Sequence, residues 1–111
     1  MAGNILPTLR ERWPEVFCSP PRPLAIGIIT QLHGELYPRE HAPNWEFSAH
    51  GRALASALAI WCSQREYFEA CVTPRAPRYS LNGEACGEVT EHQAAFARAS
   101  LARLDGLRPP T

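Results

Sequence analysis

The sequence predicts one compact, mainly α-helical domain of about five helices, with one small β-hairpin before the last helix. Three observations support this prediction. Apolar residues recur at helical spacing in most segments, Asn82-Gly83 is typical of a hairpin turn, and Thr90-Glu-His-Gln93 is a capping box. The length of 111 residues suits a single domain, and 45 % hydrophobic residues can supply its core.

The first half of the chain predicts two helices separated by a stiff connector. Ile5–Trp13 groups its apolar residues on one helical face. Cys18–Pro23 contains three prolines and is expected to be extended. From Leu24 to Leu36 an apolar residue recurs at every fourth position, which predicts a second helix despite its internal glycine. Tyr37–Asn44 carries two prolines and is expected to be a loop.

The longest helical pattern begins at Trp45 or Phe47 and runs to about Cys62. This segment is rich in alanine and leucine, which have high helix propensity. A short amphipathic helix is expected over Arg65–Val72, and Thr73–Pro77 is a second loop stiffened by proline.

The C-terminal third predicts the hairpin and the last helix. Arg78–Leu81 and Glu84–Val89 are the expected strands, joined by a two-residue turn. Thr90 is the expected N-cap of the helix that follows, and Gly106 is expected just past its end. Two prolines lie beyond that glycine.

The net charge and the choice of basic residues disfavour some functions but do not identify one. The net charge is +0, and all eleven basic residues are arginine. This balance disfavours a simple electrostatic nucleic-acid binder, yet arginine suits phosphate recognition and stacks on bases. No signal peptide and no membrane span is predicted, so a cytoplasmic protein without a membrane partner is expected.

The motifs of enzymes and metal sites are missing from the sequence. There is no GxSxG, no glycine-rich phosphate loop and no HExxH, so we expect no enzymatic activity and no small-molecule substrate. The four cysteines form no CxxC pair, and the four histidines are scattered. Free thiols, no metal and no cofactor are therefore expected, and a zinc-dependent switch is a distant alternative.

The segment from Tyr67 to Arg98 is the most informative for function. It interleaves arginines with tyrosines, a composition that stacks on unpaired bases and holds phosphates. The N-terminus of the helix after Thr90 would add backbone N–H groups for a phosphate. The alternative is that Tyr67 packs in the core and the arginines pair with nearby acids, namely Glu66, Glu69 and Glu84.

Several motifs in one order resemble the ProQ/FinO domain of bacterial RNA chaperones. They include Glu11-Arg-Trp-Pro-Glu-Val-Phe17, Arg22-Pro-Leu-Ala-Ile-Gly-Ile28, Arg78-Tyr-Ser-Leu-Asn-Gly83 and Cys86-Gly-Glu-Val-Thr90. The resemblance covers residues 9–104. It leaves residues 1–8 as a lead-in to the first helix and residues 105–111 as a proline-containing tail.

The resemblance implies a mostly helical, non-enzymatic domain that binds structured RNA and acts in post-transcriptional regulation. The expected targets are terminator-like hairpins with a single-stranded 3′ tail, in small RNAs and at mRNA 3′ ends, bound by a monomer. Tyr67 would contact sugar–phosphate, Arg78 would contact phosphate, and the turn before the last helix would receive the RNA 3′ end. The RNA-binding residues so expected are Tyr67, Arg78, Arg98, Arg52, Arg65, Gly87, Thr90, Glu91 and His92.

Departures from the family pattern predict weaker RNA binding than basic members show. Positions that are usually basic are occupied here by Ala25, Gly51, Ala55 and Ala59. Arg52 and Arg65 are neighbouring candidates for compensation, although a shift of one residue turns a helical side chain by about 100°. The alternative function is the same fold used as a protein-interaction regulator, with weak or no RNA binding.

Overall fold

The computed structural model describes residues 5–40 and 43–106, and it confirms a mainly helical fold with one hairpin before the last helix. The helices are α1 (Leu6–Arg12), α2 (Ile28–Leu36), α3 (Ala49–Cys62), α4 (Arg65–Ala70) and α5 (Glu91–Gly106). The strands are β1 (Pro77–Tyr79) and β2 (Ala85–Glu88), which pair antiparallel, and two 3₁₀ turns, η1 (Pro38–Glu40) and η2 (Trp45–Phe47), lie between α2 and α3.

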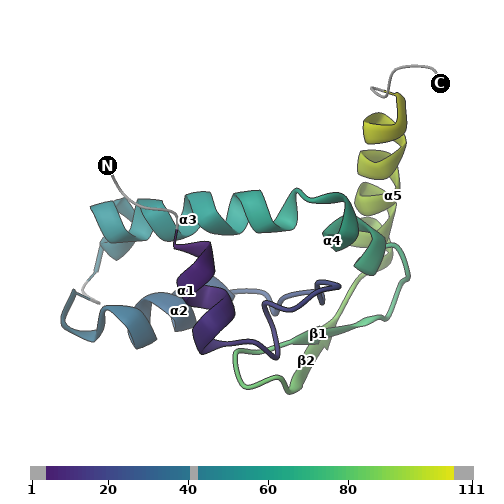
Figure 1. Ribbon diagram of the computed structural model, residues 1–111. Coiled ribbons are helices and arrows are strands. Elements are labelled where there is room, and N and C mark those ends of the chain that lie inside the picture. Colours follow the sequence, from purple (N-terminus) through teal and green to yellow (C-terminus); the bar gives the residue numbers. More distant parts are fainter. Residues whose placement is uncertain (1–4, 41–42, 107–111) are drawn as a thin grey trace.

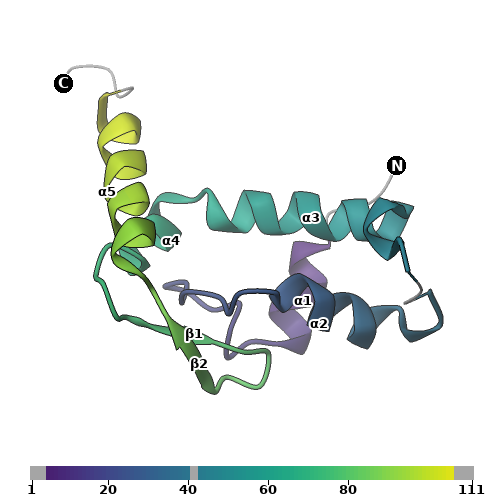
Figure 2. The same ribbon diagram turned by 180° about the vertical axis from the view of Figure 1, so that it is seen from behind.

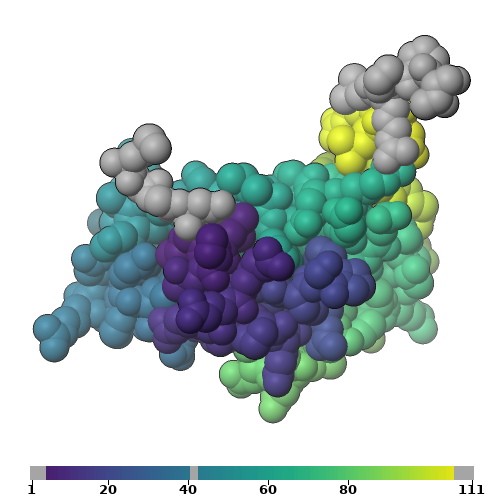
Figure 3. Space-filling model, in the orientation of Figure 1, coloured from purple at the N-terminus to yellow at the C-terminus, as the bar shows by residue number. Residues whose placement is uncertain are grey.

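The helices form two packed groups joined by the length of α3. At one end of α3, α2 packs beneath it, and at the other end α4 packs against α5 (Figure 1). The hairpin lies below α4 and leads directly into α5. Helix α1 runs from below α3 across the front of α2 in Figure 1, and it lies behind α2 when the molecule is turned (Figure 2). In the space-filling view α1 covers this face between the other two helices (Figure 3).

The core lies where α1, α2 and α3 meet the segment that follows α1. Leu9, Leu32 and Leu54 come from the three helices and are fully buried. Phe17, from the segment after α1, packs edge-on against Trp61 of α3 with ring centroids 5.4 Å apart. Burying each such side chain stabilises a fold by about 1.5–3 kcal/mol, so this cluster fixes α1 across α2 and α3.

Helix α2 begins at Ile28, so the prediction of a helix from Leu24 was wrong. Leu24 and the residue after it are extended and pair with the hairpin. The Ala25 amide donates to the Tyr79 carbonyl (2.9 Å), and the Tyr79 amide donates to Pro23 (2.9 Å). Gly27 then turns the chain with a φ of 81°, a conformation that costs glycine little. The every-fourth-residue pattern continued across this turn because both parts bury leucines in the same core.

Helix α3 begins at Ala49, because Ser48 is its N-cap. The Ser48 hydroxyl accepts a hydrogen bond from the Gly51 amide at 3.0 Å, and its extended backbone separates α3 from η2. Trp45 and Phe47 therefore lie in the preceding 3₁₀ turn rather than in the helix. The expected loop before them, Tyr37–Asn44, also contains the 3₁₀ turn η1.

Five residues, 80–84, join the two strands, which corrects the predicted two-residue turn. Ser80 donates its amide to the Glu84 carbonyl (2.9 Å), and the Gly83 amide donates to the Ser80 carbonyl (2.9 Å). Gly83 has a φ of 78°, as expected for a tight turn closed by a left-handed glycine. Gly87 also has a positive φ (88°), and the register shifts between the paired positions, which marks a bulge.

Helix α5 ends one residue later than predicted, with Gly106 as its last helical residue. Pro109 and Pro110 lie outside the described residues. Within residues 5–40 and 43–106, no helix combines the length and apolarity needed to cross a membrane.

Candidate functional site

A cavity of about 250 Å³ lies between α4 and α5, and we call it the α4–α5 cavity. Its lining is mainly apolar, with a few polar groups contributed by β1 and by the start of α5. The lining residues are Cys62, Tyr67, Phe68, Cys71, Arg78, His92, Gln93, Phe96 and Ala97. Apolar walls with few convergent polar groups are typical of binding sites.

Arg78 links three parts of the chain from within this cavity. Its guanidinium donates from Nη1 to the Leu24 carbonyl (2.7 Å) and from Nη2 to Gln93 Oε1 (2.8 Å). The residue is only 8 % exposed, and its Nε finds no hydrogen-bond partner among the described residues. A buried N–H without a partner is costly, so a ligand acceptor in the cavity would be stabilising.

Tyr67 and Arg78 both form hydrogen bonds with the backbone of the same residue, Leu24. The Tyr67 hydroxyl accepts a hydrogen bond from the Leu24 amide at 3.0 Å, while the Leu24 carbonyl accepts from Arg78. Tyr67 is 8 % exposed and belongs to the core, as the alternative interpretation of the sequence stated. Tyr67 and Arg78, which the family resemblance implied as RNA contacts, therefore hold the extended segment before α2 in place through hydrogen bonds.

The capping box at the start of α5 is formed as predicted. The Gln93 amide donates to Thr90 Oγ1 (3.1 Å), and the Thr90 amide donates to Gln93 Oε1 (3.0 Å). The first helical bond runs from the Ala94 amide to the Thr90 carbonyl (2.9 Å), so the amides of Glu91 and His92 precede it. Because Gln93 Oε1 also accepts from Arg78, the helix start and the guanidinium are held together.

Burial keeps the acidic groups of the cavity neutral. Desolvation raises the pKa of the Cys62 thiol to about 11. It also raises the pKa of Tyr67 and of Cys71 above their ordinary values. The permanently charged side chain in the lining is then the Arg78 guanidinium, which gives the cavity positive polarity together with the N-terminus of α5.

The other predicted arginines have contacts of their own. Arg65 pairs with Asp105 at 2.6 Å, and Arg98 is exposed and donates to the Val72 carbonyl at 2.9 Å. Arg52 is exposed on α3. The acids that the alternative interpretation named as partners, Glu66, Glu69 and Glu84, form no ion pair within the described residues, so that pairing was wrong.

Of the remaining predicted residues, His92 lines the cavity and Thr90 and Glu91 precede it at the start of α5. Thr90, Glu91 and His92 are exposed at the start of α5, and Gly87 is exposed in β2. Together with Tyr67 and Arg78 they lie on the hairpin, α4 and α5, whereas Arg52 lies on α3.

Sequence reasoning missed the aromatic pair at the cavity and its two thiols. Phe96 is 62 % exposed and contacts Phe68 edge-on, with ring centroids 6.4 Å apart. Its signal in the sequence was a phenylalanine outside the alanine-lined face of α5. The spacing of Cys62 and Cys71 matches no motif, and only the fold places the end of α3 and the residue after α4 around one cavity.

Two of the four positions at which the family's basic residue is missing, Ala25 and Gly51, are buried. Ala25 is 4 % exposed. A Cβ on Gly51 would collide with the Trp45 carbonyl oxygen, so this position has no room for any side chain. Ala55 and Ala59 are exposed on α3 and could carry a basic side chain. Of these four positions, the exposed ones that lack a basic side chain therefore both lie on α3.

Cofactor and metal ligands do not gather around the cavity. Among residues 5–40 and 43–106 there is no group of three or more His, Cys, Asp or Glu side chains placed to hold a metal ion. The four cysteines are free thiols.

The fold and the cavity define a small helical domain in which a hairpin anchors a binding cavity at a helix N-terminus. The chain matches the sequence profile of the ProQ/FINO family over residues 2–108, and it belongs to that family. A crystal structure of a FinO-like RNA chaperone from Neisseria meningitidis is similar, with a TM-score of 0.68 and 25 % identity. That match covers 90 % of this chain and 80 % of the other. The solution structure of a ProQ homologue from Legionella pneumophila has a TM-score of 0.67 and 24 % identity, covering 96 % and 85 % of the two chains.

Proposed function

We propose that this protein is a bacterial RNA-binding protein of the RNA-chaperone type, acting in post-transcriptional regulation rather than as an enzyme. Membership of the ProQ/FINO family and the likeness to a FinO-like RNA chaperone support this function. The partner is structured RNA, including small RNAs and mRNA 3′ ends, bound by a monomer in the cytoplasm.

The RNA feature that best fits the α4–α5 cavity is the end of a single-stranded 3′ tail. The observation that carries this assignment is Arg78, whose buried Nε has no hydrogen-bond partner in the described part of the chain and whose guanidinium lies against the start of α5. A terminal ribose or phosphate oxygen would supply the missing acceptor, and the Glu91 and His92 amides would supply further donors.

The apolar part of the cavity suits the base of the tail. Phe96 and Phe68 present aromatic surface beside the polar groups, and stacking a base on an aromatic side chain is worth about 1–3 kcal/mol. Stacking tolerates any base, so the tail would be recognised by its end and its single-stranded character rather than by its sequence.

The stem of the hairpin would contact exposed arginines outside the cavity. Arg98 lies on α5 and Arg52 lies on α3, both exposed. Arg65 is engaged by Asp105, so its contribution to the surface potential is reduced. With two exposed arginines assigned to the stem, the phosphate contribution is small, and binding should weaken only moderately as salt increases.

A tail-dependence experiment tests this proposal. Binding of a terminator hairpin with its 3′ tail is compared with binding of the same stem without the tail, by gel shift at low salt. We expect loss of most affinity without the tail. Phe96→Ala should weaken binding of the tailed RNA by about tenfold, the loss of one stacked base.

The matched control is Phe47→Ala. Phe47 is 71 % exposed, similar to Phe96, but it lies in η2 at the opposite end of α3. This variant should bind like the unmodified protein. Equal affinity for tailed and tailless RNA would refute the assignment of the cavity. No RNA binding at low salt, together with a nuclease-resistant protein partner, would favour the protein-interaction alternative instead.

A further inference from the structure

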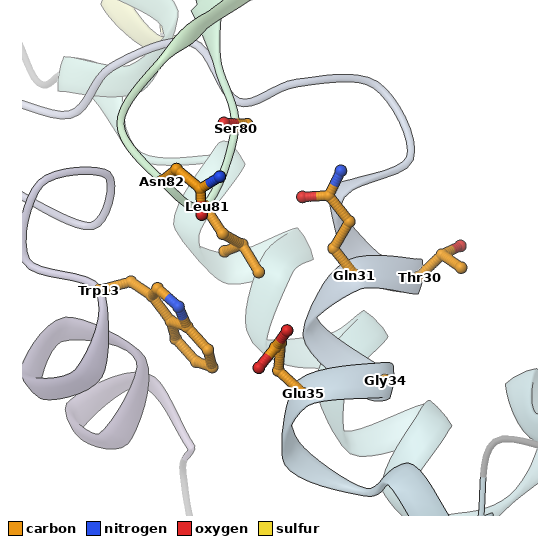
Figure 4. A pocket seen from close by; sticks show the side chains of 8 residues that line it. All are labelled: Trp13, Thr30, Gln31, Gly34, Glu35, Ser80, Leu81 and Asn82. Carbon is orange, nitrogen blue, oxygen red and sulfur yellow. The ribbon is translucent and has the colours of Figure 1, made fainter.

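A second hollow lies on the far side of the hairpin from α5, and we call it the Trp13 hollow. Its volume is about 590 Å³. The end of α1, one face of α2 and the hairpin loop form its walls (Figure 4). The lining residues are Trp13, Thr30, Gln31, Gly34, Glu35, Ser80, Leu81 and Asn82.

The polar side chains of this hollow are not used by the fold. The Glu35 carboxylate forms no ion pair within the described residues, and the Gln31 and Asn82 amides form no hydrogen bond there. In Figure 4 the Glu35 carboxylate points toward the Trp13 ring and Leu81. The lining therefore holds a carboxylate without a cationic partner among the described residues, together with amide and hydroxyl oxygens that can accept hydrogen bonds.

Gly34 keeps the hollow open at a cost to α2. A glycine inside a helix is less stable than alanine by about 1 kcal/mol. A Cβ at Gly34 would meet nothing within 4 Å, so no close packing contact requires the glycine. Its φ is not in the left-handed region that would favour glycine. The absence of a side chain does preserve room in the hollow, which is the one local consequence of this residue.

The charge of the hollow selects the class of ligand. Glu35 is the only charged side chain in the lining, so a phosphate or an RNA backbone would be repelled. Trp13 adds an aromatic ring with two faces, and the Arg12 guanidinium at 4.7 Å from the ring centroid shows that this indole accepts a cation–π contact. A carboxylate, an indole ring and neutral oxygen acceptors together favour an organic cation.

We propose that the Trp13 hollow binds a guanidinium or alkylammonium group. Glu35 forms its ion pair, Trp13 contacts it through a cation–π interaction, and Gln31, Ser80 and Asn82 accept the remaining N–H groups. The group belongs either to a free small amine or to an arginine or lysine side chain of a protein. This site is independent of RNA binding, because neither its charge nor its residues belong to the α4–α5 cavity.

Two probes distinguish the two sources of the cation. Agmatine represents the free amine, and an acetylated, amidated Gly-Arg-Gly peptide represents a protein side chain. Each is titrated into ¹⁵N-labelled full-length protein, and the indole N–H signal of Trp13 is followed. We expect a saturable shift of that signal. Tighter binding of agmatine assigns a free amine, tighter binding of the peptide assigns a protein side chain, and equal affinity shows recognition of the cationic group alone.

Three variants test the site itself. Glu35→Gln should weaken binding by about tenfold, the loss of one charge-assisted contact. Glu69 is exposed on α4, so Glu69→Gln is the matched control and should leave the affinity for both probes unchanged. Gly34→Leu should leave the protein folded, with a thermal midpoint at least as high, while the leucine fills the hollow and abolishes binding. No Trp13 shift with either probe at millimolar concentration would overturn the proposal, as would unchanged affinity in Glu35→Gln or in folded Gly34→Leu.

Discussion

The α4–α5 cavity and the exposed face of α3 differ in how their polar side chains are held. In the cavity, Arg78 is 8 % exposed and bonded to Leu24 and Gln93, so the same atoms support the fold and face a ligand. On α3, Arg52 is exposed between helix positions occupied by glycine and alanine. Substitutions in the cavity therefore change stability and binding together, whereas substitutions on α3 isolate the electrostatic part of binding.

The largest effect is expected for Arg78→Ala. Removal of the guanidinium leaves the Leu24 carbonyl without this donor and deprives the start of α5 of its tie to β1. Hydrogen bonds from a charged group are worth about 1.5–3 kcal/mol each, so loss of the two should lower the free energy of unfolding by about 3–6 kcal/mol in urea titrations.

Two further variants sharpen this result. Arg52→Ala on α3 should stay within about 0.5 kcal/mol of the unmodified protein, because its side chain is solvated. Arg78→Lys keeps the charge but cannot bridge both acceptors as a planar fork, so it should be intermediate in stability. If Arg78→Ala were as stable as Arg52→Ala, the difference between the two regions would not exist.

The second effect is a loss of stability at alkaline pH that originates in the cavity. The Cys62 thiol has a pKa of about 11 in the folded chain against an ordinary 9.0. The unfolded chain loses this proton first, so stability is constant below about pH 9 and falls up to about pH 11, by about 2 kcal/mol for this group.

Replacing the thiol tests this assignment. Cys62→Ala should reduce the slope of the unfolding free energy between about pH 9 and about pH 11, while Cys71 and Tyr67, whose pKa values are also raised, leave a residual slope in the same direction. Cys86→Ala is the control, since Cys86 is an exposed free thiol on β2. An identical alkaline slope in Cys62→Ala and in the unmodified protein would exclude the thiol as a source.

A smaller effect is expected for Tyr67→Phe. The ring continues to fill the core, but the Leu24 amide loses its acceptor. A buried N–H left unsatisfied costs about 1–3 kcal/mol, and we expect the lower half of that range because the ring is retained. Chemical denaturation measures the loss. An unchanged midpoint would mean that water replaces the hydroxyl.

The sequence predicted the existence and order of the helices and strands more reliably than it predicted their bounds. Thr90 and Gln93 form the capping box as predicted, because a capping box depends on residues three positions apart. The hairpin was located correctly, but five residues join its strands, and Gly83 closes the turn in a left-handed conformation. Local patterns thus indicated where elements lie, and less well where each begins.

Tertiary pairing explains what the sequence could not indicate. Leu24 was assigned to a helix because its spacing from Ile28 is helical, yet its backbone pairs with Tyr79, 55 positions away in the chain. Burial of Arg78 likewise depends on Leu24 and Gln93, which come from two other segments. Gly51 looked like a missing basic residue because only the fold places the Trp45 carbonyl against it.

The smallest effect, and the most direct test of the α3 face, is the addition of charge. Ala55→Arg and Ala59→Arg place cations on exposed helix positions with no packing to disturb. Each new phosphate contact should steepen the dependence of log affinity on log salt by about 0.7–0.9, with stability nearly unchanged. Filter-binding titrations of the tailed hairpin at several salt concentrations measure this slope.

The counterparts of these variants decide whether α3 contacts RNA at all. Ala55→Glu should reduce affinity by reversing the added charge at the same position. Gly51→Arg should instead destabilise the fold, because its Cβ would collide with the Trp45 carbonyl before any charge reached the surface. If both added arginines leave the salt slope unchanged, the RNA stem does not lie along α3, and recognition is confined to the α4–α5 cavity and Arg98. The low charge of α3 would then have no effect on affinity, because no phosphate would approach it.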